Sequence, residues 1–152
     1  LRRDALEMRD HGAVEAITFA DVGYPSTAHV EVPKVAKSCI AQLAESNLDL
    51  IVVELGDGIM GSYGVDSVLL DPEIKALNPA LMMAANDPVG AWGAIKRLEE
   101  RDWKPALITG PATDNDSGTI AIESLTGVPA INARANAEKM TDCVLEALRS
   151  SL

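Results

Sequence analysis

Apolar and polar positions along this chain fall into alternating blocks that predict helices separated by short strands. Apolar residues recur at helical spacing in 33–46 and 136–149, which gives each helix one apolar face. Pro88 directly after Asp87 marks the start of another helix, because proline suits the first turn and aspartate caps it. The helices expected are 1–9 (ending near Gly12), 33–46, one or two short helices within 65–77, one beginning at Pro88, 117–126 (ending at Gly127) and 136–149.

Short apolar runs lie between these helices and predict strands. The run at 50–53 is apolar at every position, which is typical of a strand buried on both faces of a parallel sheet. Strands that alternate with helices predict an α/β fold: an open, mostly parallel five-stranded sheet with helices on both faces, in a three-layer, Rossmann-like arrangement. The strands expected are 14–20, 49–55, 80–85, 105–109 and 128–131.

The length of 152 residues fits one domain, 1–152, and is too short for an eight-stranded α/β barrel, which needs roughly 200 residues or more. The first residue is Leu1 and the first residues already have a helical pattern. Two interpretations stay open: the chain is the C-terminal part of a longer protein, or it is a domain that stands alone. Its two cysteines, Cys39 and Cys143, match no metal-ligand spacing and are expected to be buried free thiols in a reducing, cytoplasmic compartment.

The formal net charge of −10 argues against nucleic acid and anionic membrane surfaces as partners, since both are negatively charged. No apolar run is long enough to span a bilayer. A small-molecule ligand is the partner that remains, with a homo-oligomer as a further possibility. A phosphorylated ligand would need local positive charge from a metal, an arginine or a helix N-terminus.

The most informative stretch runs from Asp49 to Gly61, where the apolar strand ends in Glu54 and Asp57 among glycines. Glycines after a strand allow the backbone to approach a ligand closely. Asp21 ends the preceding apolar strand in the same way. Two carboxylates from neighbouring strands repel each other unless a cation lies between them, so Asp21 and Glu54 are candidate Mg²⁺ ligands. The alternative is that these acids are separate, solvated loop residues.

Polar residues follow every predicted strand, and ligands of open parallel sheets bind beyond the carboxyl ends of the strands. Part of this pattern is generic, because turns and helix caps also need polar residues; Asp87 is explained by capping alone. The candidate ligand-binding residues are Gly56, Asp57, Gly58, Gly61, Asp114, Asn115 and Asn132.

Other catalytic patterns are weak or absent. The glycine spacing from Gly56 to Gly61 follows the G-x-G-x-x-G form, but no clear ribose-binding acid follows about 20 residues later, so an NAD site is disfavoured. No G-x-S-x-G elbow is present. His29 lies in a polar loop, where a surface histidine is the simpler interpretation.

The order of these landmarks resembles the deviant P-loop NTPases, the group of dethiobiotin synthetase and cobyric acid synthase. In that group an apolar strand ends in an acid followed by glycines, as Glu54 and 56–61 do here. The stretches 21–27, 86–90, 108–115 and 126–131 also follow the group's order. The resemblance implies ATP or another nucleotide as ligand, Mg²⁺ at Asp21 and Glu54, and base contacts from Asn115 or Asn132.

One departure from the group is large. Its phosphates are held by a glycine-rich loop ending in Gly-Lys-Ser/Thr, and no Gly-Lys pair occurs in this sequence. The sequence therefore predicts a nucleotide- or phosphate-ligand-binding α/β domain related to Mg-dependent, ATP-using ligases and NTPases, and leaves open whether the chain is an enzyme. The alternative is a non-catalytic, flavodoxin-like sensor or oligomerisation domain, which explains the missing loop.

Overall fold

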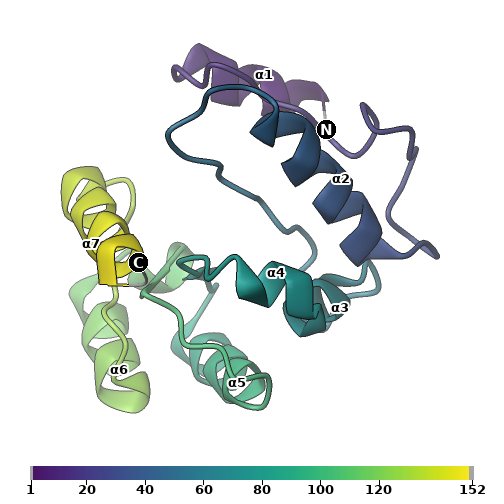
Figure 1. Ribbon diagram of the computed structural model, residues 1–152. Helices are drawn as coiled ribbons and strands as arrows, with labels where there is room; N and C mark the ends of the chain where they lie inside the picture. The colour runs from purple at the N-terminus through teal and green to yellow at the C-terminus, as the bar shows by residue number, and fades with distance from the viewer. Residues whose placement is uncertain (1, 151–152) are drawn as a thin grey trace. The chain divides into compact units, whose positions relative to one another are not determined.

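The protein is described by a computed structural model that covers residues 2–150 (Figure 1). The chain divides into two compact units, the first ending at Ile74 and the second beginning at Lys75. Each unit has its own set of elements and its own apolar cluster.

The first unit is helical. It contains α1 (Arg2–Asp10), α2 (Val32–Ala44) and α3 (Val65–Leu70), and it includes the start of α4 (Pro72–Ala76). Helix α2 begins with Pro33 in its first turn, as the sequence predicts, and α2 packs against α3. The small core of the unit is formed by Val35, Ile59, Val65, Val68, Leu69 and Ile74, each less than a tenth exposed.

An ion-pair cluster joins α2 to the start of α4. The amine of Lys37 lies 3.0 Å from Asp71 Oδ2 and 2.5 Å from Glu73 Oε2. Asp71 also caps α4, because its Oδ1 accepts hydrogen bonds from the backbone amides of Glu73 and Ile74 at 3.0 and 3.1 Å. The hydrogen bond from Lys37 holds the pKa of Asp71 below its usual value, and the hydrogen bonds to Glu73 and Asp71 raise the pKa of Lys37.

The second unit contains the sheet. Strands β1 (Met82–Ala84) and β2 (Leu107–Thr109) pair in parallel, with Met83 opposite Ile108. Ala130 adds a single parallel bridge to Ile108 on the other side of β2. Helices α5 (Pro88–Glu99) and α6 (Asp116–Thr126) connect these segments, a short 3₁₀ helix η1 (Pro111–Thr113) follows β2, and α7 (Ala137–Ser150) ends the described chain.

The core of this unit lies between the sheet and helices α5 and α6. Ile108, Ala91 and Ile122 have no exposed surface, and they come from β2, α5 and α6 respectively. Leu107 is also fully buried and points to the opposite face of the strand, where α7 contacts β2. Burial on both faces explains why β2 is apolar at consecutive positions.

The predicted fold class is wrong. The protein is mostly helical, at 49% helix, and the described chain has a two-stranded parallel sheet in place of an open five-stranded one with helices on both faces. The expected third strand of the second unit shrinks to the bridge at Ala130. The expected strands 14–20 and 49–55 of the first unit do not form among residues 2–150.

The physical reason is the lack of a ladder partner. Among the described residues, no backbone hydrogen bond involves residues 49–57, and Val52 and Val53 are 63% and 48% exposed. At the end of the segment 14–20, turns replace extended backbone, since the amides of Gly23 and Tyr24 donate to the carbonyls of Ala20 and Phe19. An apolar run becomes a strand only when neighbouring strands satisfy its amides and carbonyls.

The helix predictions are confirmed within a few residues at each end. Asp87 and Asn115 cap α5 and α6 through hydrogen bonds from Gly90 and Gly118, and Gly127 ends α6 in the left-handed conformation that glycine favours. The region 65–77 forms the two short helices α3 and α4. Helix α1 starts at Arg2 in the described chain; Leu1 lies outside it.

Candidate functional site

Polar residues gather at the carboxyl ends of the parallel segments in the second unit. Asn86 and Asp87 follow β1, Asp114 and Asn115 follow β2, and Asn132 follows the bridging residue Ala130. The parallel pairing brings these ends to one edge of the sheet, as the sequence predicts for this half of the chain. We call this edge, defined by Asn86, Asp87, Asp114, Asn115 and Asn132, the carboxyl edge.

Two helices begin at the carboxyl edge. Asp87 Oδ1 accepts from the Gly90 amide at 2.8 Å, and Asn115 Oδ1 accepts from the Gly118 amide at 2.9 Å. The amides of Asp116 and Ser117, in the first turn of α6, have no acceptor among the described residues. Unpaired first-turn amides and the helix dipole together favour an anion at such a position.

A cavity of about 300 Å³ opens between these helix starts. Its walls come from Asp87 and Pro88 at the start of α5, from Pro111 after β2, and from Ser117 and Gly118 in α6. That volume lies at the small end of the range of roughly 300–1,000 Å³ for ligand sites. The cavity is thus sized for a small ligand or for one part of a larger one.

Glycines allow the two loops of the carboxyl edge to pack closely. A Cβ on Gly118 would overlap the carbonyl oxygen of Ala112, and one on Gly110 would lie 2.7 Å from the carbonyl oxygen of Ala85. Gly110 also has φ of +93°, a conformation that residues with a side chain rarely adopt. Gly110 thus sets the distance between the loop after β1 and the loop after β2, and Gly118 sets the distance between the start of α6 and η1.

The side chain of Asn132 stabilises the loop after β2 through hydrogen bonds. Its Nδ2 donates to Thr113 O at 3.1 Å and to Asp114 Oδ1 at 3.0 Å. Its Oδ1 accepts from the amides of Arg134 and Ala135 at 3.0 and 2.8 Å. With both ends of the amide engaged, Asn132 orients Asp114, and a role in contacting a ligand directly is not required to explain it.

Thr109, the last residue of β2, carries a buried hydroxyl that has no hydrogen-bond partner among residues 2–150. An unpaired buried hydroxyl costs free energy and is uncommon in folded proteins. It lies directly before Gly110, at the root of the loop that forms one wall of the cavity.

The glycine loop at 56–61 lies in the first unit, whereas Asp114, Asn115 and Asn132 lie in the second. Asp57 and Gly58 have φ of +71° and +70°, and the Gly61 amide donates to Gly58 O at 3.3 Å. A Cβ on Gly61 would overlap Asp57, so the loop folds back on itself. Gly56 is exposed and has open space around it.

The two candidate metal ligands are also in the first unit. Asp21 accepts hydrogen bonds from the amide and the hydroxyl of Thr18 at 2.7 and 2.9 Å, which makes it a turn-stabilising residue. Glu54 is exposed. Within the part of the chain that the structure describes, no group of three or more His, Cys, Asp or Glu side chains could hold a metal ion. The assignment of Mg²⁺ to Asp21 and Glu54 stays a prediction.

Both cysteines are free and partly buried. Burial raises the pKa of the Cys39 thiol, and the negative charge of Asp21 raises it further. A thiol with a raised pKa is a poor nucleophile at neutral pH. The structure therefore gives Cys39 a packing role.

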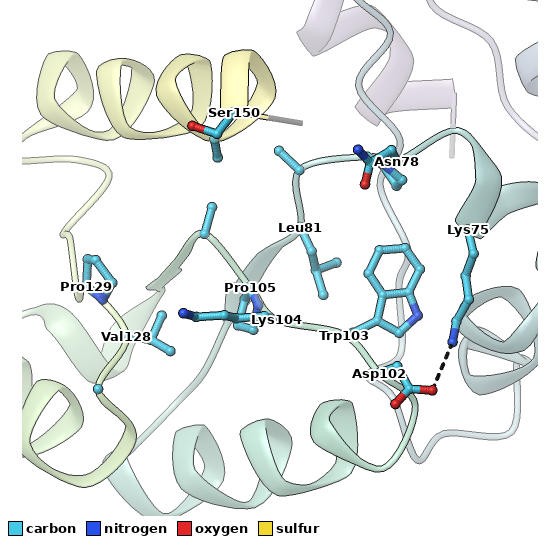
Figure 2. Close-up of a pocket in the computed structure, with 15 residues that line it drawn as sticks. Lys75, Asn78, Leu81, Asp102, Trp103, Lys104, Pro105, Val128, Pro129 and Ser150 are labelled. Atoms are coloured by element: carbon cyan, nitrogen blue, oxygen red, sulfur yellow. Dashed lines mark ion pairs between the residues drawn. The ribbon is translucent and has the colours of Figure 1, made fainter. Parts of the chain in front are cut away.

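Sequence reasoning missed two features of the second unit. It did not single out Ser117, because a serine in the first turn of a helix has no distinctive pattern. It also missed a larger cavity of about 620 Å³ at the opposite, amino end of the strands, where Trp103 and Lys104 lie in the loop between α5 and β2 (Figure 2). Helix C-termini point to that end, so it is the less suitable edge for a multiply charged anion.

No family model, no curated protein and no solved structure matches this chain. Among the residues that the structure describes, no helix combines the length and apolar character needed to cross a membrane.

Proposed function

We propose that the second unit binds a small phosphorylated ligand, a nucleotide or a simple phosphate ester, in the cavity of the carboxyl edge. The observation that carries this proposal is the start of α6, where the unpaired amides of Asp116 and Ser117 adjoin a cavity of about 300 Å³ lined by Ser117 itself. Backbone amides at a helix start supply donors and partial positive charge without any lysine. That matters in a chain with 23 acidic and 13 basic residues.

The carboxylates of the edge require a counter-ion in this proposal. Asp87 lines the cavity, so a phosphate would approach negative charge as well as amides. Mg²⁺ typically binds through one or two carboxylates, with phosphate oxygens and water completing its shell. The residues present fit that mode and do not fit an all-protein metal cage. Mg²⁺ would neutralise part of the phosphate charge, and Asp87 is the candidate ligand in the lining.

Isothermal titration calorimetry of the full chain with ADP and with inorganic phosphate, each with and without Mg²⁺, tests the proposal. The informative variant is Ser117→Glu, because glutamate is well tolerated in a first helical turn yet places a carboxylate where the phosphate would bind. We expect saturable binding of at least one probe by the wild type and a loss of about tenfold or more in Ser117→Glu.

Ser124→Glu is the matched control, since Ser124 is an exposed serine farther along the same helix. It introduces the same charge away from the cavity and should keep the wild-type affinity. The proposal is wrong if neither probe binds the wild type, or if the two glutamate variants bind a probe equally well.

A further inference from the structure

The cavity at the amino end of the strands in the second unit has apolar walls. Its volume is about 620 Å³, and its lining includes Leu81 before β1, Trp103 and Pro105 before β2, and Val128 and Pro129 after α6. Figure 2 shows the indole of Trp103 beside Leu81, with Val128 and Pro129 on the other side of the pocket. A cavity of this size with mostly apolar and aromatic walls is typical of small-molecule sites.

The cavity has two lysines, and they have different surroundings. The amine of Lys75 donates to Arg101 O and lies 4.0 Å from Asp102 Oδ2, and the latter ion pair is drawn as a dashed line in Figure 2. Lys75 thereby neutralises the carbonyl end of α5, where the helix dipole is negative. Lys104 forms no hydrogen bond and no ion pair with any described residue.

Lys104, which is exposed, therefore brings to the cavity a positive charge that no described residue pairs with. Figure 2 shows its side chain extending from the backbone next to Pro105 in the direction of Val128, along the apolar wall. A lysine stem covers apolar surface while its amine stays available for an anionic partner. The other charges of the lining, Lys75 and Asp102, are paired with each other.

We infer that this cavity is a second binding site, independent of the carboxyl edge, for a small monoanion with a flat apolar body, such as an aromatic carboxylate or sulfonate. The apolar body packs against Trp103, Leu81 and Val128, and the anionic group pairs with the amine of Lys104. A single negative charge fits this end of the sheet better than a phosphate does, because the surrounding helix C-termini repel a multiply charged anion.

The test uses 8-anilinonaphthalene-1-sulfonate as the anionic probe and N-phenyl-1-naphthylamine as a neutral probe of nearly the same shape. The chain has two tryptophans, and Trp92 is 46% exposed on α5, so Trp92→Phe leaves Trp103 as the reporter. In the Trp92→Phe chain we expect the sulfonate to shift the indole N–H resonance of Trp103 in a saturable way.

Two lysine variants in the Trp92→Phe chain separate charge from apolar contact. Lys104→Met keeps an apolar stem and removes the amine, and should weaken sulfonate binding about tenfold, the loss expected for one charge-assisted contact. It should leave binding of the neutral probe nearly unchanged. Lys139→Met, at an exposed lysine of α7, makes the same change in net charge and should leave both affinities unchanged.

The inference is overturned if the sulfonate leaves the Trp103 resonance unshifted, or if Lys104→Met and Lys139→Met bind it equally well. A displacement experiment tests independence from the carboxyl edge. Saturating ADP with Mg²⁺ should not release the sulfonate from Trp103, whereas release would show that both ligands share one site.

Discussion

The two units of this chain contain apolar runs of similar character in very different surroundings. In the second unit, Leu107 and Ile108 have no exposed surface, and their strand pairs with β1 and with Ala130. In the first unit, Leu50, Val52 and Val53 are about half exposed or more and have no ladder partner among the described residues. The difference shows that an apolar run specifies a preference for burial, and that a paired neighbour decides whether it becomes a strand.

Amide hydrogen exchange should show this contrast most strongly. The Ile108 amide donates to Pro129 O at 2.8 Å inside the core, so this hydrogen bond opens, and the amide exchanges, only when the second unit unfolds. The amides of Val52 and Val53 should exchange at close to the rate of an unfolded peptide, about a thousandfold or more faster. Strong protection at Val52 and Val53 in the isolated full chain would contradict the exposed state of this segment.

Truncation of one apolar side chain in each unit is the next largest contrast. Ile108→Ala should lower the free energy of unfolding by about 2–5 kcal/mol, because it leaves a cavity in the core. Val52→Ala should change it by less than about 0.5 kcal/mol, since that side chain is largely exposed. Urea unfolding followed by circular dichroism measures both, and similar losses in the two variants would show that 49–55 is buried in solution.

The glycine at the carboxyl edge provides a smaller and more local test. Gly118→Ala should destabilise the second unit by about 1–3 kcal/mol, because its Cβ overlaps the Ala112 carbonyl. Gly93→Ala is the matched control in α5, where a Cβ meets no atom within 4 Å, and it should stabilise the protein by about 0.5–1 kcal/mol. Thermal unfolding should shift in opposite directions for the two variants; a gain in Gly118→Ala would argue against the close approach of the start of α6 to the Ala112 carbonyl.

The buried hydroxyl of Thr109 is the one site at which we expect a substitution to increase stability by removing a polar group. Thr109→Val removes a buried hydroxyl that has no partner in the described part of the chain and keeps the shape of the side chain, so it should raise the free energy of unfolding by about 1 kcal/mol. Chemical unfolding measures the gain. A clear loss of stability would mean that the hydroxyl has a partner in solution, and a loss of phosphate-probe binding would place that partner in the ligand.

The ion-pair cluster of the first unit should respond to pH by a small amount. Because the pKa of Asp71 is lowered in the folded state, its contribution to stability is present above about pH 4 and is lost as the pH falls through the folded value. The raised pKa of Lys37 makes its contribution present below about pH 10 and lost at higher pH. Lys37→Met should therefore make the melting temperature less dependent on pH below about pH 4, and an unchanged acid dependence would rule out the pair as its source.

Local residue chemistry made the helices predictable. Pro88 after Asp87 and the stop at Gly127 act within a few residues of the helix ends that they mark, and the structure confirms both. Strands could be predicted only as apolar runs. Two of them formed as β1 and β2, one became a bridge, and the segments 14–20 and 49–55 stayed unpaired in the described chain.

The candidate site was predictable to the same degree. Asp114, Asn115 and Asn132 lie at one edge because they follow parallel segments of one unit, which the alternation of elements indicates. The roles of the individual residues at that edge were not predictable: Asn132 donates a hydrogen bond to Asp114, Asn115 caps a helix, and Ser117 lines the cavity. Gly56, Asp57, Gly58 and Gly61 form a closed loop in the other unit, a division that no local pattern reveals.

The sequence by itself therefore determined the helices, the Asp87 cap and the parallel character of the strands in the second unit, because these depend on neighbouring residues and on the period of apolar positions. Only the tertiary structure decided which apolar runs pair, which polar residues share an edge and which lysine of the amino-end cavity has no partner among the described residues. Strand pairing, cavities and ion pairs join residues far apart in the chain, and their formation depends on the free energy of packing the whole unit, which short-range patterns do not encode.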